Sequence, residues 1–349
     1  KKIWAVNPDA LILDAAVIQS GKLPKYSYIA ELNKELKKLV DEVGSDKLFL
    51  VDQAQTFDWK KHTIADMVHP NKEGAKTIAQ TWFNAIELHV KPGQDAYTPE
   101  RITYKKGENY QLDLHLFKPV GYEPGAKHPV IIFFFGGGWT YGTPLQFYRE
   151  CAYYASKGIV AVAADYRISS INKTTPFESF EDAKDAIRWL RGHADEYAID
   201  TNRIIAAGAS AGGQLAAALG NIRPKEEEAH LPAYRPDLLL LYYPVADNGP
   251  DGHGPQIIKK RYQEFSPLHN ISANSPATLF ILGTKDKYVP VETGLLYQRK
   301  MLDAGVDCDL ILIEGGKHPL FEYRKPLTEK FYDVRYITDN FLRRQGIIE

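Results

Sequence analysis

Residues 202–219 read Asn-Arg-Ile-Ile-Ala-Ala-Gly-Ala-Ser-Ala-Gly-Gly-Gln-Leu-Ala-Ala-Ala-Leu, which predicts a short apolar strand, a turn of very small residues and an alanine-rich helix. The turn, Gly208 to Gly212, matches the pattern G-x-S-x-G, in which a serine stands on a sharp strand-to-helix turn. Small neighbours are needed there because bulk on either side would clash with the strand or the helix. The turn lifts the hydroxyl of Ser210 out of the sheet, near the positive end of the helix dipole. Taken alone, the motif also allows a tight turn whose serine merely caps the helix.

Strand and helix patterns alternate along most of the remaining chain. Apolar strands are predicted at residues 129–135, 159–165, 203–208, 237–244, 277–283 and 308–313. Helices are predicted at residues 145–157, 178–197, 212–220, 291–304 and about 326–345. Residues 101–106 and 110–119 alternate apolar and polar side chains, which predicts an antiparallel pair at a sheet edge. We therefore expect an α/β fold with a doubly wound, mostly parallel sheet covered by helices on both faces.

The N-terminal part of the chain predicts a smaller α/β segment. Its strands are predicted at residues 9–18 and 47–52, and its helices at residues 28–43 and 75–86. The resulting order of strand, helix, strand, loop and helix is typical of a parallel-sheet unit. Residues 91–99 contain Pro and Gly without periodicity and form the predicted linker. The expected domains are therefore residues 1–92 and 93–349.

The composition indicates a globular protein with a sizeable core, because 44% of the 349 residues are hydrophobic and 25% are charged. Lys and Arg number 43 and Asp and Glu number 44, so the net charge of −1 gives no attraction to nucleic acid or anionic membranes. No apolar run approaches the roughly 20 residues that span a bilayer. Cys151 and Cys308 are the only cysteines, which excludes a disulfide framework and any C-x-x-C metal or redox site.

Three polar residues suggest acyl transfer by a serine. This chemistry needs a nucleophile, a base, a carboxylate that orients the base, and donors for the developing oxyanion. Ser210 is the candidate nucleophile, Asp286 follows the strand predicted at 277–283, and His318 follows the strand predicted at 308–313. Ligands of open α/β sheets bind at the carboxyl ends of the strands, so we expect these side chains at one edge of the sheet. Their order along the chain is also that of the G-x-S-x-G hydrolases.

The glycines in Phe135-Gly-Gly-Gly-Trp139, directly after an apolar strand, predict an oxyanion-binding loop. Backbone N–H groups without side chains beside them can point at a substrate oxygen. One such donor contributes about 2.7–4 kcal/mol of transition-state stabilisation. A phosphate-binding loop is the weaker alternative, because the sequence has no G-x-G-x-x-G and no Walker lysine, and bulky residues follow the glycines.

Through these motifs, residues 95–349 resemble the α/β-hydrolase-fold carboxylesterases. Within that fold, they look close to the hormone-sensitive-lipase-like esterases and to the feruloyl and acetyl-xylan esterases. Two further stretches carry this resemblance, Ala164-Asp-Tyr-Arg167 and Phe265-Ser-Pro-Leu268.

The resemblance implies roles for individual residues. The implied catalytic triad consists of Ser210, Asp286 and His318. The implied oxyanion hole consists of the N–H groups of Gly137, Gly138 and Ala211. The sequence departs from the family at Phe135, where the family usually has a histidine that braces the loop by hydrogen bonds. We expect packing of the aromatic ring to brace the loop in this chain.

Residues 1–90 resemble the C-terminal block of the SGNH (GDSL-type) esterases. Asp66-Met-Val-His69 matches the D-x-x-H loop of that family, which precedes a closing helix. A carboxylate three residues before a histidine can hold the imidazole in one tautomer. The G-D-S serine and the oxyanion Gly and Asn blocks of that family are absent before residue 66. We interpret the segment as a partial SGNH (flavodoxin-like) domain with a vestigial Asp66–His69 pair. We expect it to be inactive on its own and to dock on the esterase domain. The alternative is a helix entry at which the Asp and His are ordinary surface residues.

Other polar residues receive weaker roles. Asp247 is the alternative triad acid, although it follows a strand that comes one too early. His253 and His269 lie in the irregular stretch 247–276, which is expected to cover part of the site, and both are expected at its rim or on the surface. Glu226–Glu228 is expected to be a solvated helix end. No H-E-x-x-H or comparable ligand spacing occurs, so no metal is implied.

The leading interpretation is a serine carboxylesterase that acts on short acyl or aryl esters, with acetyl or feruloyl groups on plant polysaccharide as expected substrates. The short 247–276 stretch favours an open pocket. Its expected lining includes Trp139, Tyr141, Tyr166 and Tyr288. Alternatives are a serine peptidase of the prolyl-oligopeptidase type and a catalytically inactive, ligand-binding hydrolase fold. The expected partner is a small-molecule or oligosaccharide ester, and no cofactor, nucleic acid or membrane is expected to bind. Analogy suggests a secreted or periplasmic bacterial protein. No pattern predicts an oligomeric state.

Overall fold

The structure is a computed structural model that describes residues 12–45, 47–89, 98–123, 125–250, 252–320 and 329–349. Contacts within the chain divide it into two units, Lys1–Gln94 and Asp95–Glu349. Most of the linker predicted at 91–99 lies outside the described residues. The same holds for residues 9–11 of the first predicted strand and for 326–328 of the last predicted helix.

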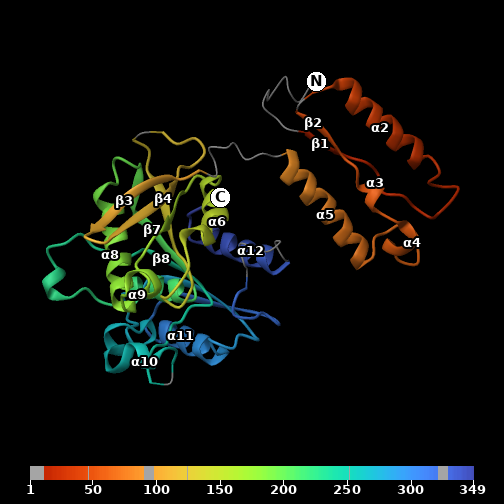
Figure 1. Ribbon diagram of the computed structural model, residues 1–349. Coiled ribbons are helices and arrows are strands. Elements are labelled where there is room, and N and C mark those ends of the chain that lie inside the picture. The colour runs from red at the N-terminus through yellow and green to blue at the C-terminus, as the bar shows by residue number, and fades with distance from the viewer. Residues whose placement is uncertain (1–11, 46, 90–97, 124, 251, 321–328) are drawn as a thin grey trace. The chain divides into compact units, whose positions relative to one another are not determined.

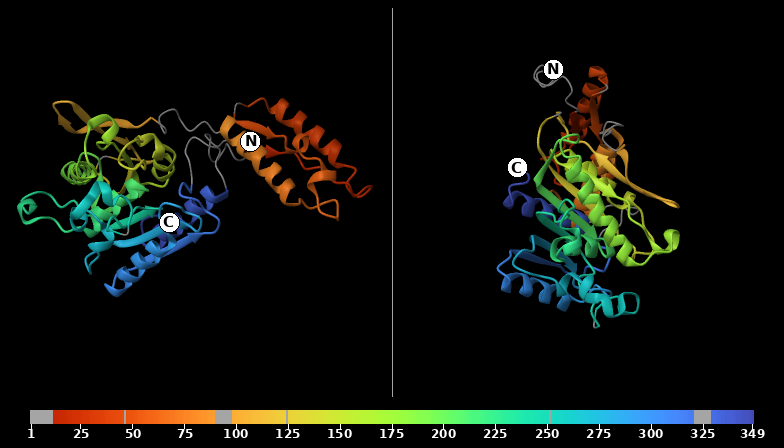
Figure 2. Two further views of the ribbon diagram at one scale, coloured as in Figure 1. Left: turned by 60° about the horizontal axis from the view of Figure 1, so that its bottom comes forward. Right: turned by 90° about the vertical axis from the view of Figure 1, so that its left-hand side faces the viewer.

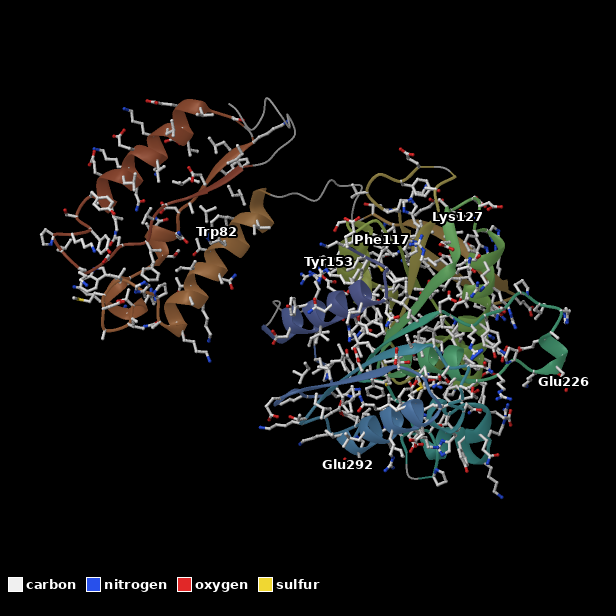
Figure 3. All side chains as sticks on the ribbon, turned by 180° about the vertical axis from the view of Figure 1, so that it is seen from behind. Trp82, Phe117, Lys127, Tyr153, Glu226 and Glu292 are labelled. Carbon is white, nitrogen blue, oxygen red and sulfur yellow. The ribbon has the colours of Figure 1, made fainter. Side chains whose placement is uncertain are left out.

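The first unit is built around a pair of parallel strands. Its elements, in chain order, are β1 (Ile12–Ala15), α2 (Ile29–Val43), β2 (Leu48–Val51), α3 (Gln53–Thr56), α4 (Trp59–His62) and α5 (Lys72–His89). The strands pair from Ile12 opposite Leu48 to Ala15 opposite Val51. Trp82, labelled in Figure 3, is partly buried on α5. The strand–helix–strand order and the closing helix agree with the pattern predicted from the sequence.

The second unit contains a mostly parallel sheet with eight strands among the described residues, in the order β10-β9-β8-β7-β5-β6-β4-β3. The strands are β3 (Glu100–Gly107), β4 (Tyr110–Phe117), β5 (His128–Phe134), β6 (Val160–Ala164), β7 (Ile199–Ala209), β8 (Leu238–Tyr242), β9 (Ala277–Gly283) and β10 (Cys308–Ile313). All pairs from β10 to β6 are parallel, whereas β4 and β3 run antiparallel at one edge. The mostly parallel α/β sheet predicted from the sequence is confirmed.

Helices cover both faces of this sheet, which explains why the inner parts of its central strands are almost wholly apolar. The main helices are α6 (Tyr148–Ala155), α8 (Pro176–Gly192), α9 (Ala211–Asn221), α11 (Val291–Asp303) and α12 (Glu329–Arg344). Figures 1 and 2 show α8 and α9 together on one side of the sheet, with α6 and α12 on the other. Between α6 and α12, Tyr153 hydrogen-bonds to Asp339, and Glu150 pairs with Arg335 at 3.6 Å. Burying each large apolar side chain stabilises such a core by about 1.5–3 kcal/mol.

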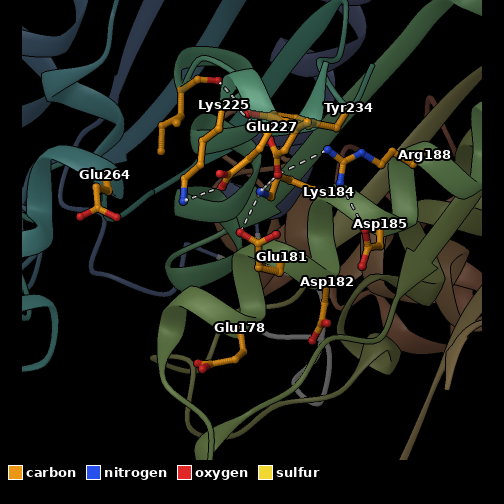
Figure 4. Close-up of polar contacts among 12 residues, drawn as sticks. Glu178, Glu181, Asp182, Lys184, Asp185, Arg188, Lys225, Glu227, Tyr234 and Glu264 are labelled. Carbon is orange, nitrogen blue, oxygen red and sulfur yellow. Dashed lines mark hydrogen bonds and ion pairs between the residues drawn. The ribbon is translucent and has the colours of Figure 1, made fainter. Parts of the chain in front are cut away.

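Charged side chains hold α8 against the segment that precedes β8 (Figure 4). The Lys184 ammonium is almost fully buried and lies 2.7 Å from Glu181 and 2.5 Å from Glu228. Arg188 also approaches Glu228, at 3.5 Å. A buried cation needs such counter-charges because the protein interior solvates it poorly. The expectation of a solvated helix end at Glu226–Glu228 is therefore wrong for Glu228, although Glu226 and Glu227 are exposed.

The connection from β8 to β9 carries only short helical turns among its described residues. These are α10 (Pro255–Ile258), η4 (Lys259–Glu264) and η5 (Pro267–His269). This agrees with the expected short cover over the sheet edge. The carboxyl ends of β5, β7, β9 and β10 consequently meet at one accessible edge, because these strands run parallel.

Candidate active site

Ser210 stands on a sharp turn between β7 and α9, with φ 54° and ψ −116°. Positive φ is uncommon for a residue with a side chain, and it persists only where the surroundings hold it. The Ser210 N–H donates to the carbonyl of Tyr242 at 3.0 Å. A Cβ at Gly208 would lie 2.3 Å from the oxygen of Gly212, and one at Gly212 would lie 2.0 Å from the oxygen of Phe134. The small residues of the motif are therefore required by close approach of three backbone segments.

A chain of hydrogen bonds links the three side chains singled out in the sequence. Ser210 Oγ lies 2.8 Å from His318 Nε2, and His318 Nδ1 lies 2.8 Å from Asp286 Oδ2. The other carboxylate oxygen, Asp286 Oδ1, accepts hydrogen bonds from the N–H groups of Tyr288 at 2.8 Å and Val289 at 2.9 Å. The residues come from the ends of β7, β9 and β10. The structure thus brings together one serine, one histidine and one aspartate from distant parts of the chain.

Burial and hydrogen bonding together define the charge state of this aspartate. The Asp286 side chain is 0% exposed and that of His318 is 15% exposed. Burial raises the pKa of Asp286, but the hydrogen bonds from His318 and from the Val289 and Tyr288 amides outweigh it and hold the pKa below its usual value. An ionised carboxylate at Nδ1 keeps the proton on that nitrogen. The His318 Nε2 lone pair is then directed at the serine hydroxyl.

The Gly-rich loop after β5 lies beside Ser210. Gly137 has φ 139°, and a Cβ on it would lie 1.8 Å from the carbonyl oxygen of Tyr141, so only glycine fits. Within the described part of the chain, no atom accepts a hydrogen bond from the N–H groups of Gly137, Gly138 or Ala211. These three N–H groups are available as donors next to the serine.

Aromatic packing and one amide side chain brace the same loop. The ring of Phe135 stacks on Tyr166, with centroids 4.1 Å apart and planes 14° from parallel. The Tyr166 hydroxyl donates to the Phe135 carbonyl at 2.6 Å. Gln146 Oε1 accepts from the Gly136 N–H, also at 2.6 Å. The expected aromatic brace is present, whereas the role of Gln146 was missed because no motif marks it.

A cavity of about 720 Å³ opens beside Ser210. Its lining residues are Gly136, Gly137, Gly138, Tyr141, Gly142, Thr143, Gln146, Ser210, Tyr243, Val245, His253, Tyr288, His318 and Pro319. Two of the four expected pocket residues, Tyr141 and Tyr288, are among them and are largely exposed. The other two are corrected: Trp139 and Tyr166 are buried beneath the loop. Trp139 packs edge-on against Phe265 at 5.8 Å, so both aromatic side chains support the loop instead of lining the cavity.

The histidines and the alternative acid of the 247–276 stretch occupy different places. His253, expected at the rim or on the surface, lines the cavity itself. Asp247 instead accepts from the Gly249 N–H at 2.7 Å and lies 3.7 Å from His269 Nδ1. Asp286, and not Asp247, therefore stands beside His318 in the structure. His253 could not be identified from the sequence because an irregular segment carries no period that locates its side chains.

The first unit holds a separate Asp–His pair. Asp66 Oδ2 lies 2.5 Å from His69 Nδ1, and Asp66 Oδ1 accepts from the N–H groups of Val68 and His69 at 2.9 and 3.0 Å. These hydrogen bonds, chiefly that from the His69 side chain, lower the pKa of Asp66 to about 2. Among the described residues, no hydroxyl group hydrogen-bonds to the other ring nitrogen of His69.

Among the described residues, no His, Cys, Asp and Glu side chains gather in a group of three or more that could hold a metal ion. In the same residues, no helix combines the length and apolar character needed to cross a membrane.

Several known proteins are similar to this chain. The family model BD-FAE matches residues 114–236, within the second unit. Esterase 2 of the planctomycete Thermogutta terrifontis is 34% identical with a TM-score of 0.67, over 72% of this chain and 94% of that one. Esterase LipC of Mycobacterium tuberculosis is 28% identical over 215 residues, which are 55% of this chain and about half (52%) of LipC. Ethyl acetate hydrolase of Pseudomonas putida is 28% identical over 236 residues, 60% of this chain and 72% of that protein. The SGNH resemblance of residues 1–90 stays a prediction.

Proposed function

Because the chain belongs to the α/β-hydrolase esterases, a family of serine ester hydrolases, we propose that it hydrolyses short-chain acyl or aryl esters at Ser210. The observation that carries this proposal is the hydrogen-bonded chain from Asp286 through His318 to the serine hydroxyl. Both of its hydrogen bonds are 2.8 Å long. The unpartnered N–H groups beside the serine add support, because acyl transfer needs donors at that position.

In the proposed mechanism, Ser210 Oγ attacks the ester carbonyl while His318 Nε2 takes the hydroxyl proton. Asp286 stabilises the imidazolium that forms. The N–H groups of Gly137, Gly138 and Ala211 hydrogen-bond to the oxyanion of the tetrahedral intermediate. When the intermediate collapses, the ester C–O bond breaks and the imidazolium returns its proton to the departing alkoxide. Water then attacks the acyl-enzyme with His318 again as base, which releases the acid and restores the serine.

The cavity supports a neutral substrate with a short acyl group. No Lys, Arg, Asp or Glu is among the described residues that line it. Tyr141 and Tyr288 offer exposed rings, which suit the flat face of a sugar or an aryl group. Ethyl acetate hydrolase is named for an acetyl ester, and Thermogutta terrifontis esterase 2 has been solved with propionate and with butyrate bound. We propose acetyl or feruloyl esters of plant polysaccharide as the substrate class.

For the first unit, the proposal is a partial SGNH segment, residues 1–92, without hydrolytic activity of its own. Its support is the Asp66–His69 hydrogen bond together with the absence, among the described residues, of a hydroxyl bonded to the far nitrogen of His69.

Replacing the nucleophile tests the proposed function. Ser210→Ala is expected to lower kcat on p-nitrophenyl acetate about 10⁴-fold or more, because the attacking oxygen is removed. Ser170→Ala, at an exposed serine outside the cavity lining, is the matched control and is expected to keep full activity. Mass spectrometry after reaction with an organophosphonate is expected to locate the adduct on Ser210.

Two outcomes would overturn the assignment. One is full esterase activity in Ser210→Ala. The other is cleavage of a proline-containing p-nitroanilide without cleavage of esters, which would indicate a serine peptidase of the prolyl-oligopeptidase type.

A further inference from the structure

His253 places a second imidazole in the wall of the cavity, and the proposed mechanism does not use it. The residue is partly buried and lies in the connection between β8 and β9. Among the described residues, no atom hydrogen-bonds to either nitrogen of its ring. A polar group that faces a cavity without a protein partner is available to a ligand.

Hydrogen bonds hold the backbone of His253 itself, so the ring is presented from a defined position. The His253 N–H donates to the carbonyl of Asp247 at 2.8 Å. The His253 carbonyl accepts from the side-chain amide of Asn248 at 3.1 Å. Asn248 is itself buried, and its N–H donates to Ser266 Oγ at 2.9 Å. Binding through His253 therefore requires little ordering of the loop.

The neighbouring rings indicate which part of an ester reaches His253. The His253 ring lies edge-on to Tyr288, with centroids 6.3 Å apart, and Tyr288 lies 5.0 Å from the His318 ring. His318 returns its proton to the departing alkoxide, so the alcohol part of the ester must lie on the His318 side of the cavity. His253 and Tyr288 also line the cavity, and their ring contacts connect them to His318.

The chemistry of the ring indicates the kind of group it binds. Burial, followed by the charge of His318, lowers the pKa of His253, and Asp286 only partly opposes this. A neutral imidazole donates a hydrogen bond from one nitrogen and accepts one at the other. It can therefore pair with a hydroxyl group, which also both donates and accepts. A ligand with a carboxylate or an ammonium group would instead require a fixed opposite charge in the cavity wall. No Lys, Arg, Asp or Glu occurs among the described lining residues.

We propose that His253 and Tyr288 form the alcohol subsite, in which the His253 ring hydrogen-bonds to a free hydroxyl group of a polyhydroxylated alcohol such as a sugar. The inference rests on the proposed function, since it presupposes ester hydrolysis at Ser210. It adds that the enzyme discriminates between alcohols by their hydroxyl groups, through a residue that takes no part in the acyl transfer.

A matched pair of substrates tests the subsite. Propyl acetate and 2,3-dihydroxypropyl acetate have the same acyl group and carbon chain and differ only in two hydroxyl groups on the alcohol. His253→Phe keeps a ring but removes both nitrogens, and is expected to lower kcat/KM for the dihydroxylated ester about tenfold while the propyl ester changes less than about twofold. His253→Gln, which retains a donor and an acceptor, is expected to recover most of the loss.

The controls separate a binding role from a structural one. His230→Phe, at an exposed histidine outside the cavity lining, is expected to leave the ratio of the two kcat/KM values unchanged. Thermal unfolding of each variant checks the fold. If His253→Phe lowers kcat/KM equally for both substrates, or for neither, the alcohol subsite is overturned while the esterase function stands. If the wild-type enzyme cleaves neither ester, the proposed function fails and the subsite fails with it.

Discussion

Each unit of this protein contains an Asp–His pair, and the two pairs share the same local hydrogen bonds. In both, one carboxylate oxygen accepts the backbone N–H groups two and three residues further along the chain, at 2.8–3.0 Å. In both, the other oxygen binds the imidazole Nδ1, at 2.5 Å for Asp66–His69 and 2.8 Å for Asp286–His318. A short turn is therefore enough to build an Asp–His pair, and the pair alone does not make an active site.

The difference between the pairs lies in what surrounds them. The side chains of Asp286 and His318 are 0% and 15% exposed, against 35% and 74% for Asp66 and His69. Water competes for the hydrogen bonds of an exposed pair, so such a pair contributes little to stability. The buried pair, by contrast, directs its second nitrogen at Ser210 Oγ. Long-range contacts between strand ends, and not the local turn, distinguish the candidate catalytic pair.

The largest expected effect comes from the same substitution in the two pairs. Asp286→Asn is expected to lower kcat on p-nitrophenyl acetate about 10⁴-fold, because the amide no longer holds the proton on His318 Nδ1. Asp66→Asn is expected to change kcat less than about twofold. Circular dichroism of both variants checks that the fold is retained.

Asp247→Asn supplies the decisive control for that comparison. It tests the alternative acid, which lies near His269 and not His318. Loss of activity in this variant with retention in Asp286→Asn would reverse the assignment of the two aspartates.

A smaller effect is expected where side chains brace the backbone around each pair. Gln146→Leu removes the acceptor of the Gly136 N–H and loosens the glycine loop, so kcat is expected to fall about tenfold with little change in KM. In the first unit, Asn71 makes comparable contacts, to the carbonyls of Lys61 and Thr63 at 2.8 and 3.2 Å. Asn71→Ala is expected to leave kcat unchanged in the same steady-state assay.

The result for Gln146 separates bracing from binding. A rise in KM at constant kcat would show that Gln146 acts on ground-state binding of the substrate and not on the loop. Equal losses of kcat in Gln146→Leu and Asn71→Ala would instead indicate a general effect on folding.

The sequence was sufficient to predict that three polar side chains meet at one edge of the sheet. Ser210, Asp286 and His318 could be expected at one edge because parallel strands align their carboxyl ends, and the strands themselves follow from apolar runs. Trp139 was expected in the pocket and is buried, because the direction of its side chain depends on contacts with Phe265, more than 100 residues away. His253 was expected at the rim and lines the cavity, because no periodic pattern fixes side chains in an irregular segment.

The smallest expected effect concerns the exposed pair itself. The pKa of Asp66 is about 2 in the folded protein against an ordinary value of 3.8. Because this pKa is lowered, the ionised Asp66 carboxylate stabilises the folded state at pH values above about 4. This contribution to the free energy of unfolding is lost as the pH falls through about 2. A ¹³C NMR titration of the Asp66 carboxyl group is expected to show this midpoint, and His69→Ala is expected to raise it towards 3.8 because the His69 side chain is the main cause of the shift. A wild-type midpoint near 3.8 would mean that water replaces the hydrogen bond in solution, and the resemblance between the two pairs would then be confined to the turn.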